Sequence, residues 1–513
     1  MSTGYDVSAS PRRRPLSSAA SGPTILPLER DAGGMDDRDA DGTESLTTRV
    51  DALEPAIGRT WTDDRPWALL TRLTELPTRM GGSPGERRAA DLVGEAFRDA
   101  GLEDVSITEF PMQYWERGST EFAVFGDRSR SDDALEDAEP DRVDAGRNRS
   151  FEAIALPYSP AGDVTGPLVD VGYGTPEEIA DADLQGAIAL SSTTTPPGKR
   201  FVHRMETFGH AVAAGAAGFV FANHVPGQLP PTGALTFDGV AAAPGIGVSA
   251  ETGDWLREYA ADGVRARIRV DATTRDGSSQ NVAGAVGPDT DEEVLVVAHY
   301  DAHDVAEGAL DNGCGIATVV GAAAILSAIE DSLARRVRLV GVGCEEIGLL
   351  GAEALADDID LESVSAVLNV DGAGRFRNLR ALTHGSEGLE TLAERVIDDL
   401  GQPVTVESDP HPFSDHWPFL RAGVPALQLH SEPPEGRERG RGWGHTAADT
   451  RDKADPRNLR EHAVLTACLA CELTHASVPR VSDADLREQL QAQEYESGMQ
   501  AADLWPDRWA DRA

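Results

Sequence analysis

Histidine and carboxylate residues follow several apolar segments of this 513-residue sequence, in positions where they could bind metal ions. The segment VLVVAHYDA ends with His299 and Asp301, and the segment VRLVGVGCEE ends with Glu345 and Glu346. Apolar runs of this kind are typical of buried strands in α/β proteins. Sites in open α/β sheets form at the carboxyl ends of the strands, so we expect these side chains to converge.

Three further residues complete a candidate metal-binding set. Asp371 follows the apolar run AVLNVDG, Asp311 lies in the turn GALDNGCG before a predicted helix, and His445 lies in GWGHTAADT. Two zinc ions about 3.5–4 Å apart need a bridging carboxylate and further nitrogen or oxygen ligands on each side. The predicted ligands are therefore two imidazoles and three carboxylates: His299, Asp311, Glu346, Asp371 and His445.

Two other carboxylates have predicted roles beside these ligands. A water between two zinc ions becomes a nucleophile near neutral pH, because the cations lower its pKa. A carboxylate that is not a ligand must then take its proton and pass it to the leaving amine, and Glu345 is placed for this catalytic role. Asp301 lies two residues after His299, on the same face of an extended segment, so it can accept the other imidazole N–H and fix the ring.

Taken one at a time, these residues have ordinary structural explanations. Asp311 could cap the helix that follows it, and Glu345 with Glu346 could be a solvated pair. Coincidence explains poorly why several buried-type strands all end in ligand-type residues. The role of His303 stays open, because this residue lies in the loop between two predicted ligands. We interpret other histidines as structural, such as His203, His210, His224, His384, His430, His462 and His475.

The order of the motifs resembles the co-catalytic zinc aminopeptidase family, which also includes glutamate carboxypeptidases, glutaminyl cyclases and the transferrin receptors. That family has H-x-D, a D-N-x-x-G turn, paired Glu, an Asp after a strand, and His in H-T-x-x-D. Here these read HYD, DNGCG, CEEIGLLGAE, NVDG and HTAADT. The resemblance covers about residues 60–125 and 280–475. It implies two zinc ions as cofactors, a peptide substrate, Asp311 as the bridging ligand and Glu345 as the base.

Two other segments carry weaker resemblances. Residues 153–270 alternate short β-type runs with turns around one predicted helix at about 203–216, and AVAAGAAGFVFANH and APGIGVSAETGDWL resemble a protease-associated (PA) domain. The segment SDHWPFLRAGVPALQL resembles a family segment in which Ser-Asp-His precedes Pro-Phe. This second resemblance implies that His416 lies near the substrate, although Asp415 and His416 could also be a satisfied loop pair.

We therefore predict an α/β protein with a three-layer zinc-exopeptidase fold, in which a mixed, largely parallel sheet lies between helices. A β-rich PA-like domain is inserted into it. The predicted segments are a disordered N-terminal segment at 1–48, the first part of the peptidase domain at 49–150, the PA-like insert at 151–275, the main part of the peptidase domain at 276–478, and an acidic, peripheral C-terminal tail at 479–513.

The charge balance of the chain is strongly acidic. There are 87 Asp and Glu residues against 46 Lys and Arg, a net charge of −41, and Lys199 and Lys453 are the only lysines. Such a charge repels itself in dilute buffer, and molar salt screens the repulsion to a few Å. We predict adaptation to high salt, and we favour it over an acidic partner-binding surface because the acidic residues are spread along the chain. Nucleic-acid binding is disfavoured, because no basic patch is visible.

The sequence shows no convincing signal peptide or transmembrane segment, so we predict a cytoplasmic protein. No run of 18 apolar residues is present, so we expect no membrane span, and the N-terminal residues lack the apolar core of an export signal. The cysteines Cys314 and Cys344 suggest no disulfide framework. Cys468 and Cys471 are expected to pack on one helix face.

Among exopeptidases we favour an aminopeptidase. A carboxypeptidase would need cations for the terminal carboxylate, and the candidates are Arg375, Arg377, Arg437, Arg439 and Arg441. The large helical dimerisation domain of glutamate carboxypeptidases has no counterpart after the last predicted helix. A single-zinc cyclase conflicts with the complete five-ligand set, and a receptor-like binding module conflicts with an intact Glu345. The sequence leaves open which substrate side chains are preferred, what the oligomeric state is, and whether Met1 or Met35 is the start.

Overall fold

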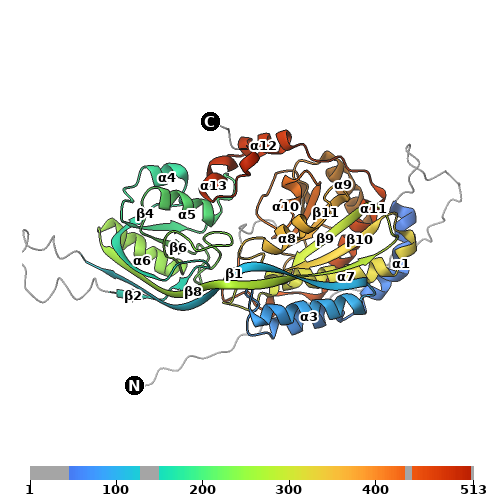
Figure 1. The fold of residues 1–513 in the computed structure, drawn as a ribbon, viewed down its shortest axis with the longest axis horizontal. Helices are drawn as coiled ribbons and strands as arrows, with labels where there is room; N and C mark the ends of the chain where they lie inside the picture. Colours follow the sequence, from blue (N-terminus) through green and yellow to red (C-terminus); the bar gives the residue numbers. More distant parts are fainter. Residues whose placement is uncertain (1–45, 127–148, 434–441, 510–513) are drawn as a thin grey trace, which may run out of the picture. The chain divides into compact units, whose positions relative to one another are not determined.

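Two long antiparallel strands, β1 (Glu103–Phe125) and β8 (Arg265–Val286), form the ribbon that joins the two parts of the fold (Figure 1). The computed structural model describes residues 46–126, 149–433 and 442–509. Most of the predicted disordered segment 1–48, and the candidate cations Arg437, Arg439 and Arg441, lie outside the described residues.

The remaining strands are short. In chain order they are β2 Arg149–Phe151, β3 Ile154–Ala155, β4 Gly162–Asp170, β5 Ile188–Ser192, β6 Gly218–Ala222, β7 Gly245–Val248, β9 Glu293–His299, β10 Arg336–Val342, β11 Val364–Val370, β12 Leu379–Leu382, β13 Val404–Glu407 and β14 Ala426–Ser431.

The helices fall mostly between these strands and after the last of them. They are α1 Leu46–Thr60, α2 Arg65–Thr74, α3 Pro84–Asp99, α4 Pro176–Ala180, α5 Arg204–Ala213, α6 Ala250–Ala261, α7 Cys314–Ser327, α8 Leu350–Asp358, α9 Glu387–Leu400, α10 Trp417–Arg421, α11 Pro456–His475, α12 Asp483–Ala492 and α13 Tyr495–Ala501. Short turns of helix are η2 Ala309–Gly313, η3 Glu330–Ser332, η4 Arg451–Lys453 and η5 Asp507–Trp509.

Strand β8 links the strands of the insert to the rest of one continuous sheet. Its first half pairs with β4 of the insert, and its second half pairs with β10 of the peptidase part. The first half alternates, with Ala266 and Ile268 buried and Arg267 exposed, whereas the second half is mostly buried. The sequence predicted only the second half, NVAGAVG, because an apolar run is the stronger signal and the alternating half is interrupted by polar residues.

The peptidase sheet has the order β13-β12-β14-β11-β9-β10-β8. Strand β9 is parallel to β10 and β11, so the carboxyl ends of these strands share one edge of the sheet. Along β9, Val294 and Val296 pack into one apolar core with residues of α3, α7 and α11. Leu295 and Val297 pack into the opposite core with residues of α8 and α10. Strands buried on both faces give the predicted three-layer α/β fold (Figure 1).

The insert is itself an α/β unit. Strands β5, β6 and β7 are parallel, β4 pairs with β5, and helices α4, α5 and α6 accompany them. The sequence predicted α5 but not the other two helices. The start of helix α6 could have been recognised in the sequence, because serine is a favoured residue just before a helix. In the structure the Ser249 side chain accepts a hydrogen bond from the Thr252 amide and caps the helix.

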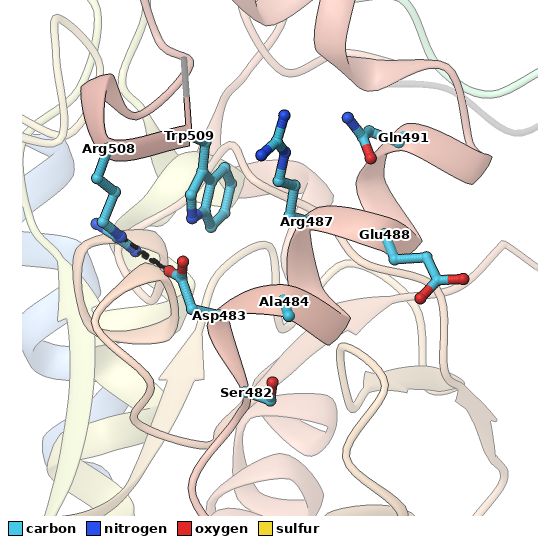
Figure 2. A pocket seen from close by; sticks show the side chains of 8 residues that line it. All are labelled: Ser482, Asp483, Ala484, Arg487, Glu488, Gln491, Arg508 and Trp509. Carbon is cyan, nitrogen blue, oxygen red and sulfur yellow. Dashed lines mark hydrogen bonds and ion pairs between the residues drawn. The ribbon is translucent and has the colours of Figure 1, made fainter. Parts of the chain in front are cut away.

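The C-terminal residues are not the peripheral tail that the sequence predicted. Helices α12 and α13 and the residues after them bury Leu490, Met499 and Trp509 in the same core as α8 and α10. A hollow of about 590 Å³ lies beside α12, and Arg508 pairs with Asp483 at 2.7 Å in its wall. Figure 2 shows the side chains that line it. No predicted metal ligand lines this hollow. The sequence analysis missed this packing, because the apolar residues that anchor the segment are widely spaced in an acidic stretch.

One helical stretch of the described residues, Ala309–Ser327, is long and apolar enough to cross a membrane by length and composition alone. Within the structure 89% of that window is buried, and α7 packs against α11 and β9 as a core helix.

Candidate metal centre

The parallel strands bring most of the predicted ligands to one place. His299 is the last residue of β9, Asp371 follows β11, and Glu346 follows the end of β10 by four residues. Asp311 lies in η2, immediately before α7, and His445 lies in the loop 442–450 ahead of α11. The common carboxyl edge of parallel strands is the reason that residues distant in sequence meet here.

The five predicted ligands form two groups that share Asp311. In the first, His299 Nε2 lies 3.3 Å from Asp311 Oδ1 and 3.7 Å from Asp371 Oδ1. In the second, His445 Nε2 lies 3.2 Å from Asp311 Oδ2 and 3.2 Å from Glu346 Oε2. Ligands about 2.0–2.1 Å from a tetrahedral zinc ion are about 3.3 Å apart, so the donor atoms are spaced as zinc requires.

The electrostatics of the site also favour cations. Burial by itself would raise the pKa of Asp311, but hydrogen bonds and charge from His299 and His445 hold that pKa well below its usual range. Burial also works to lower the pKa of His299, yet the surrounding carboxylates hold it well above the ordinary value. Buried carboxylates crowded around imidazoles need a compensating charge. Metal ions supply that charge and displace the imidazole protons.

Solvent reaches the site from the side of the aspartates. The Asp311 side chain is 25% exposed and the Asp371 side chain 16%, whereas His299 is fully buried. Glu345 is half-buried and Glu346 is buried. A substrate can therefore approach Asp311, Asp371 and Glu345 while the remaining donors stay in the interior.

Asp301 lies where the sequence predicted it, and it makes contacts beyond that prediction. Its Oδ1 is 3.3 Å from His299 Nδ1, on the side of the ring away from the donor group. The same carboxylate accepts the backbone amides of Glu345 at 3.1 Å and Glu346 at 3.3 Å. One buried side chain thus fixes both the imidazole and the backbone that carries the paired glutamates.

A second buried carboxylate also holds the turn that carries the paired glutamates. Glu86 of α3 accepts the Cys344 amide at 3.1 Å and the Ser279 hydroxyl at 2.7 Å. Burial, followed by the charge of Asp301, raises the pKa of Glu86 to about 8. Sequence reasoning missed Glu86, because a glutamate in the first turn of a helix is ordinary.

Asp449 positions the bridging ligand, and the sequence analysis gave it no role. Its two oxygens accept the backbone amides of Leu310 at 2.7 Å and Asp311 at 3.1 Å. It is 2% exposed, and burial raises its pKa to about 7. The signal was available, because Asp449 is the aspartate of the HTAADT motif that contains His445.

The insert takes part in the site through Thr232. The Thr232 carbonyl oxygen lies 3.2 Å from His445 Nδ1, and the Thr232 amide donates to the His445 carbonyl oxygen at 2.8 Å. Such a contact leaves Nε2 of His445 for the donor group. No sequence signal could have found it, because the two residues are 213 positions apart.

His416 lies outside the two donor groups. It is fully buried, its Nε2 is 2.7 Å from the His411 carbonyl oxygen, and its Nδ1 is 3.3 Å from the Asn369 side chain. The nearby Ser414 hydroxyl donates to Asp371 Oδ2 at 2.8 Å. The segment therefore supports Asp371, and the predicted contact of His416 with the substrate stays a prediction.

Comparisons with known proteins agree with this geometry. Residues 281–470 match the model of Peptidase family M28, and residues 164–256 match the PA domain. The chain thus contains a region similar to peptidase family M28 and, ahead of it, a region similar to the PA domain. The M28 match contains all five predicted ligands, Glu345 and Asp301.

Curated relatives and solved structures cover most of the chain. It is 25% identical over 430 residues to Aminopeptidase YwaD of Bacillus subtilis, which is 79% of this chain and 84% of the relative. It is 24% identical over 410 residues to mouse Carboxypeptidase Q, which is 76% of this chain and 82% of the relative. The structure of a zinc aminopeptidase from Bacillus subtilis superposes with a TM-score of 0.60 at 23% identity, covering 80% of this chain and 94% of that one.

The protein should lose metal affinity when Asp449 is changed. We expect Asp449→Asn to weaken zinc binding by about 10- to 100-fold, because an amide offers one acceptor oxygen where two backbone amides need acceptors. The measurement is a titration of metal-free protein with zinc against a chromogenic chelator. Asp452→Asn, an exposed change on the same loop, is the control and should bind zinc like the wild type. Equal affinities for both variants would contradict the role of Asp449.

Proposed function

We propose that this M28 peptidase is an aminopeptidase that uses two zinc ions, a water held between them and Glu345 as the general base. The support is threefold: two donor groups share Asp311, a carboxylate that is not a ligand stands beside both, and curated and solved relatives carry the name aminopeptidase. When bound, the zinc ions would activate that water and polarise the carbonyl of the scissile peptide bond.

Glu345 is the observation that carries the proposal. It is half-buried, its amide donates to Asp301, and it lies immediately before Glu346 in the turn after β10. Burial, partly offset by His299, and the neighbouring carboxylate of Asp415 hold its pKa well above the ordinary value for glutamate. A carboxylate with a raised proton affinity can take a proton from water and return it to the leaving amine.

The acidic character of the open side supports recognition of an amino terminus. Asp311, Asp371 and Glu345 are the partly exposed groups there, and a protonated amine pairs with carboxylates. A terminal carboxylate would meet repulsion at the same place unless a cation were available for it.

Replacement of the base should separate catalysis from metal binding. We expect Glu345→Gln to keep both zinc ions and to lower kcat by about 10²- to 10⁴-fold, because the amide cannot accept the proton. The assay follows chromophore release from a set of aminoacyl anilides, with zinc content measured on the same samples. Glu330→Gln, at an exposed position after α7, should retain wild-type activity. Full activity of Glu345→Gln would contradict the base role.

A carboxypeptidase is the second candidate function. Arg117 Nη1 is buried without a hydrogen-bond partner in the described residues, and mouse Carboxypeptidase Q is among the relatives. Against this, Asp304 already pairs with the Arg117 guanidinium at 2.6 Å. Peptides with a blocked amino terminus distinguish the two functions. Their cleavage by a wild type that leaves aminoacyl anilides intact would replace the aminopeptidase proposal with a carboxypeptidase.

The net charge of −41 supports a further proposal, that the enzyme works in a cytoplasm of molar salt. Self-repulsion weakens the compact state in dilute buffer, and salt screens it. We expect the thermal midpoint Tm, measured by circular dichroism, to rise steadily as KCl increases from about 0.1 M to several molar. Sucrose, which stabilises by exclusion without screening charge, is the control. A Tm that does not depend on KCl would contradict the proposal.

A further inference from the structure

We propose that His303 is a sixth metal ligand, which binds the second metal ion together with Asp311, Glu346 and His445. The inference rests on the proposed two-metal function and adds to it a difference between the two metal positions. His303 lies in the loop after β9, four residues beyond His299, and sequence analysis left its role open.

The geometry of His303 fits a ligand. Its Nε2 lies 2.9 Å from Glu346 Oε2, and its ring centroid is 4.5 Å from that of His445, at an interplanar angle of 75°. One donor atom each from His303, Glu346 and His445 lies within 4.8 Å of the other two. The Nε2 atoms of His303 and His445 lie 2.9 and 3.2 Å from the same oxygen of Glu346, so the three donor atoms are close enough to contact one ion.

The burial of His303 makes a purely structural role costly. The residue is 4% exposed, and neither ring nitrogen makes a hydrogen bond of acceptable geometry with the described residues, despite the close approach of Glu346. A buried polar group without a partner costs free energy. His299, a predicted ligand that is also fully buried, likewise makes no hydrogen bond at Nε2 with the described residues. A metal ion would satisfy Nε2 of each ring.

Contacts on both sides of His303 hold it in place. The Ala302 amide donates to the Arg79 carbonyl oxygen at 3.1 Å, and Asp304 pairs with Arg117 of β1 at 2.6 Å. The Arg117–Asp304 pair is largely buried, with side chains 12% and 22% exposed. Metal ligands are generally fixed by such supporting contacts, and a mobile loop residue would not be.

The two metal positions then have different numbers of protein donors. The first has His299, Asp311 and Asp371, and the second has His303, Glu346, His445 and the other oxygen of Asp311. We infer that the second position, with four protein donors against three, holds its metal more tightly than the first.

The test compares the wild type with His303→Gln. The control is His475→Gln, which removes a histidine at the end of α11, where it contacts the Ser332 carbonyl oxygen. Zinc affinities come from titration of metal-free protein against a chromogenic chelator. Proton NMR of the cobalt(II)-substituted proteins in water gives one strongly shifted imidazole N–H signal for each histidine that binds cobalt.

We expect shifted signals from His299, His303 and His445 in the wild type and in the control, and the loss of one signal in His303→Gln. The tighter zinc affinity should fall by more than about 100-fold in that variant, beyond the loss typical of a supporting residue. The Tm values of the metal-free proteins should agree, which would show that the substitution does not simply unfold the chain.

Signals from only two histidines in the wild type would overturn the proposal, whatever the variant does, so the test does not depend on the variant folding. Weaker zinc binding by His303→Gln with an unchanged set of signals would also overturn it, since His303 would then act through Glu346. A wild type with signals from three histidines that cleaves no aminoacyl anilide would contradict the proposed function and leave the ligand assignment standing.

Discussion

The structure depends on the convergence of buried anionic groups at the carboxyl edge of a parallel sheet. Asp311 turns one oxygen to His299 and the other to His445, and Asp371 and Glu346 complete the two groups. Carboxylates packed this closely in a poorly solvated place repel one another unless cations lie between them. Bound metal ions would therefore contribute to the stability of this region as well as to its chemistry.

Hydrogen bonds from backbone amides to buried carboxylates position the segments that carry the ligands and the base. Asp301, Glu86 and Asp449 each accept amides of the segments that carry a ligand or the base. These carboxylates come from three different parts of the chain, so the site is rigid only when α3, the β9 loop and the 442–450 loop are all in place. Thr232 adds the insert to this arrangement through its contact with His445.

Much of this could be predicted from sequence, for identifiable reasons. Apolar runs that end in His299, Glu346 and Asp371 predicted both the strands and the edge of the sheet at which the strands end. The anchoring residues could not be found in that way, because Glu86 and Thr232 act through contacts with segments far away in the sequence. The packed C-terminal helices were missed for a different reason, since their few apolar residues are scattered among acidic ones. Residues 1–45 lie outside the described residues, so the disorder predicted for them stays a prediction.

The most direct test of the two-metal account is the anomalous scattering of crystals grown with zinc, measured on both sides of the zinc absorption edge. The account predicts two anomalous peaks about 3.5–4 Å apart. One should lie between His299 and Asp371, the other between Glu346 and His445, with Asp311 between the peaks. A single peak in fully loaded crystals, or two peaks away from Asp311, would contradict the account.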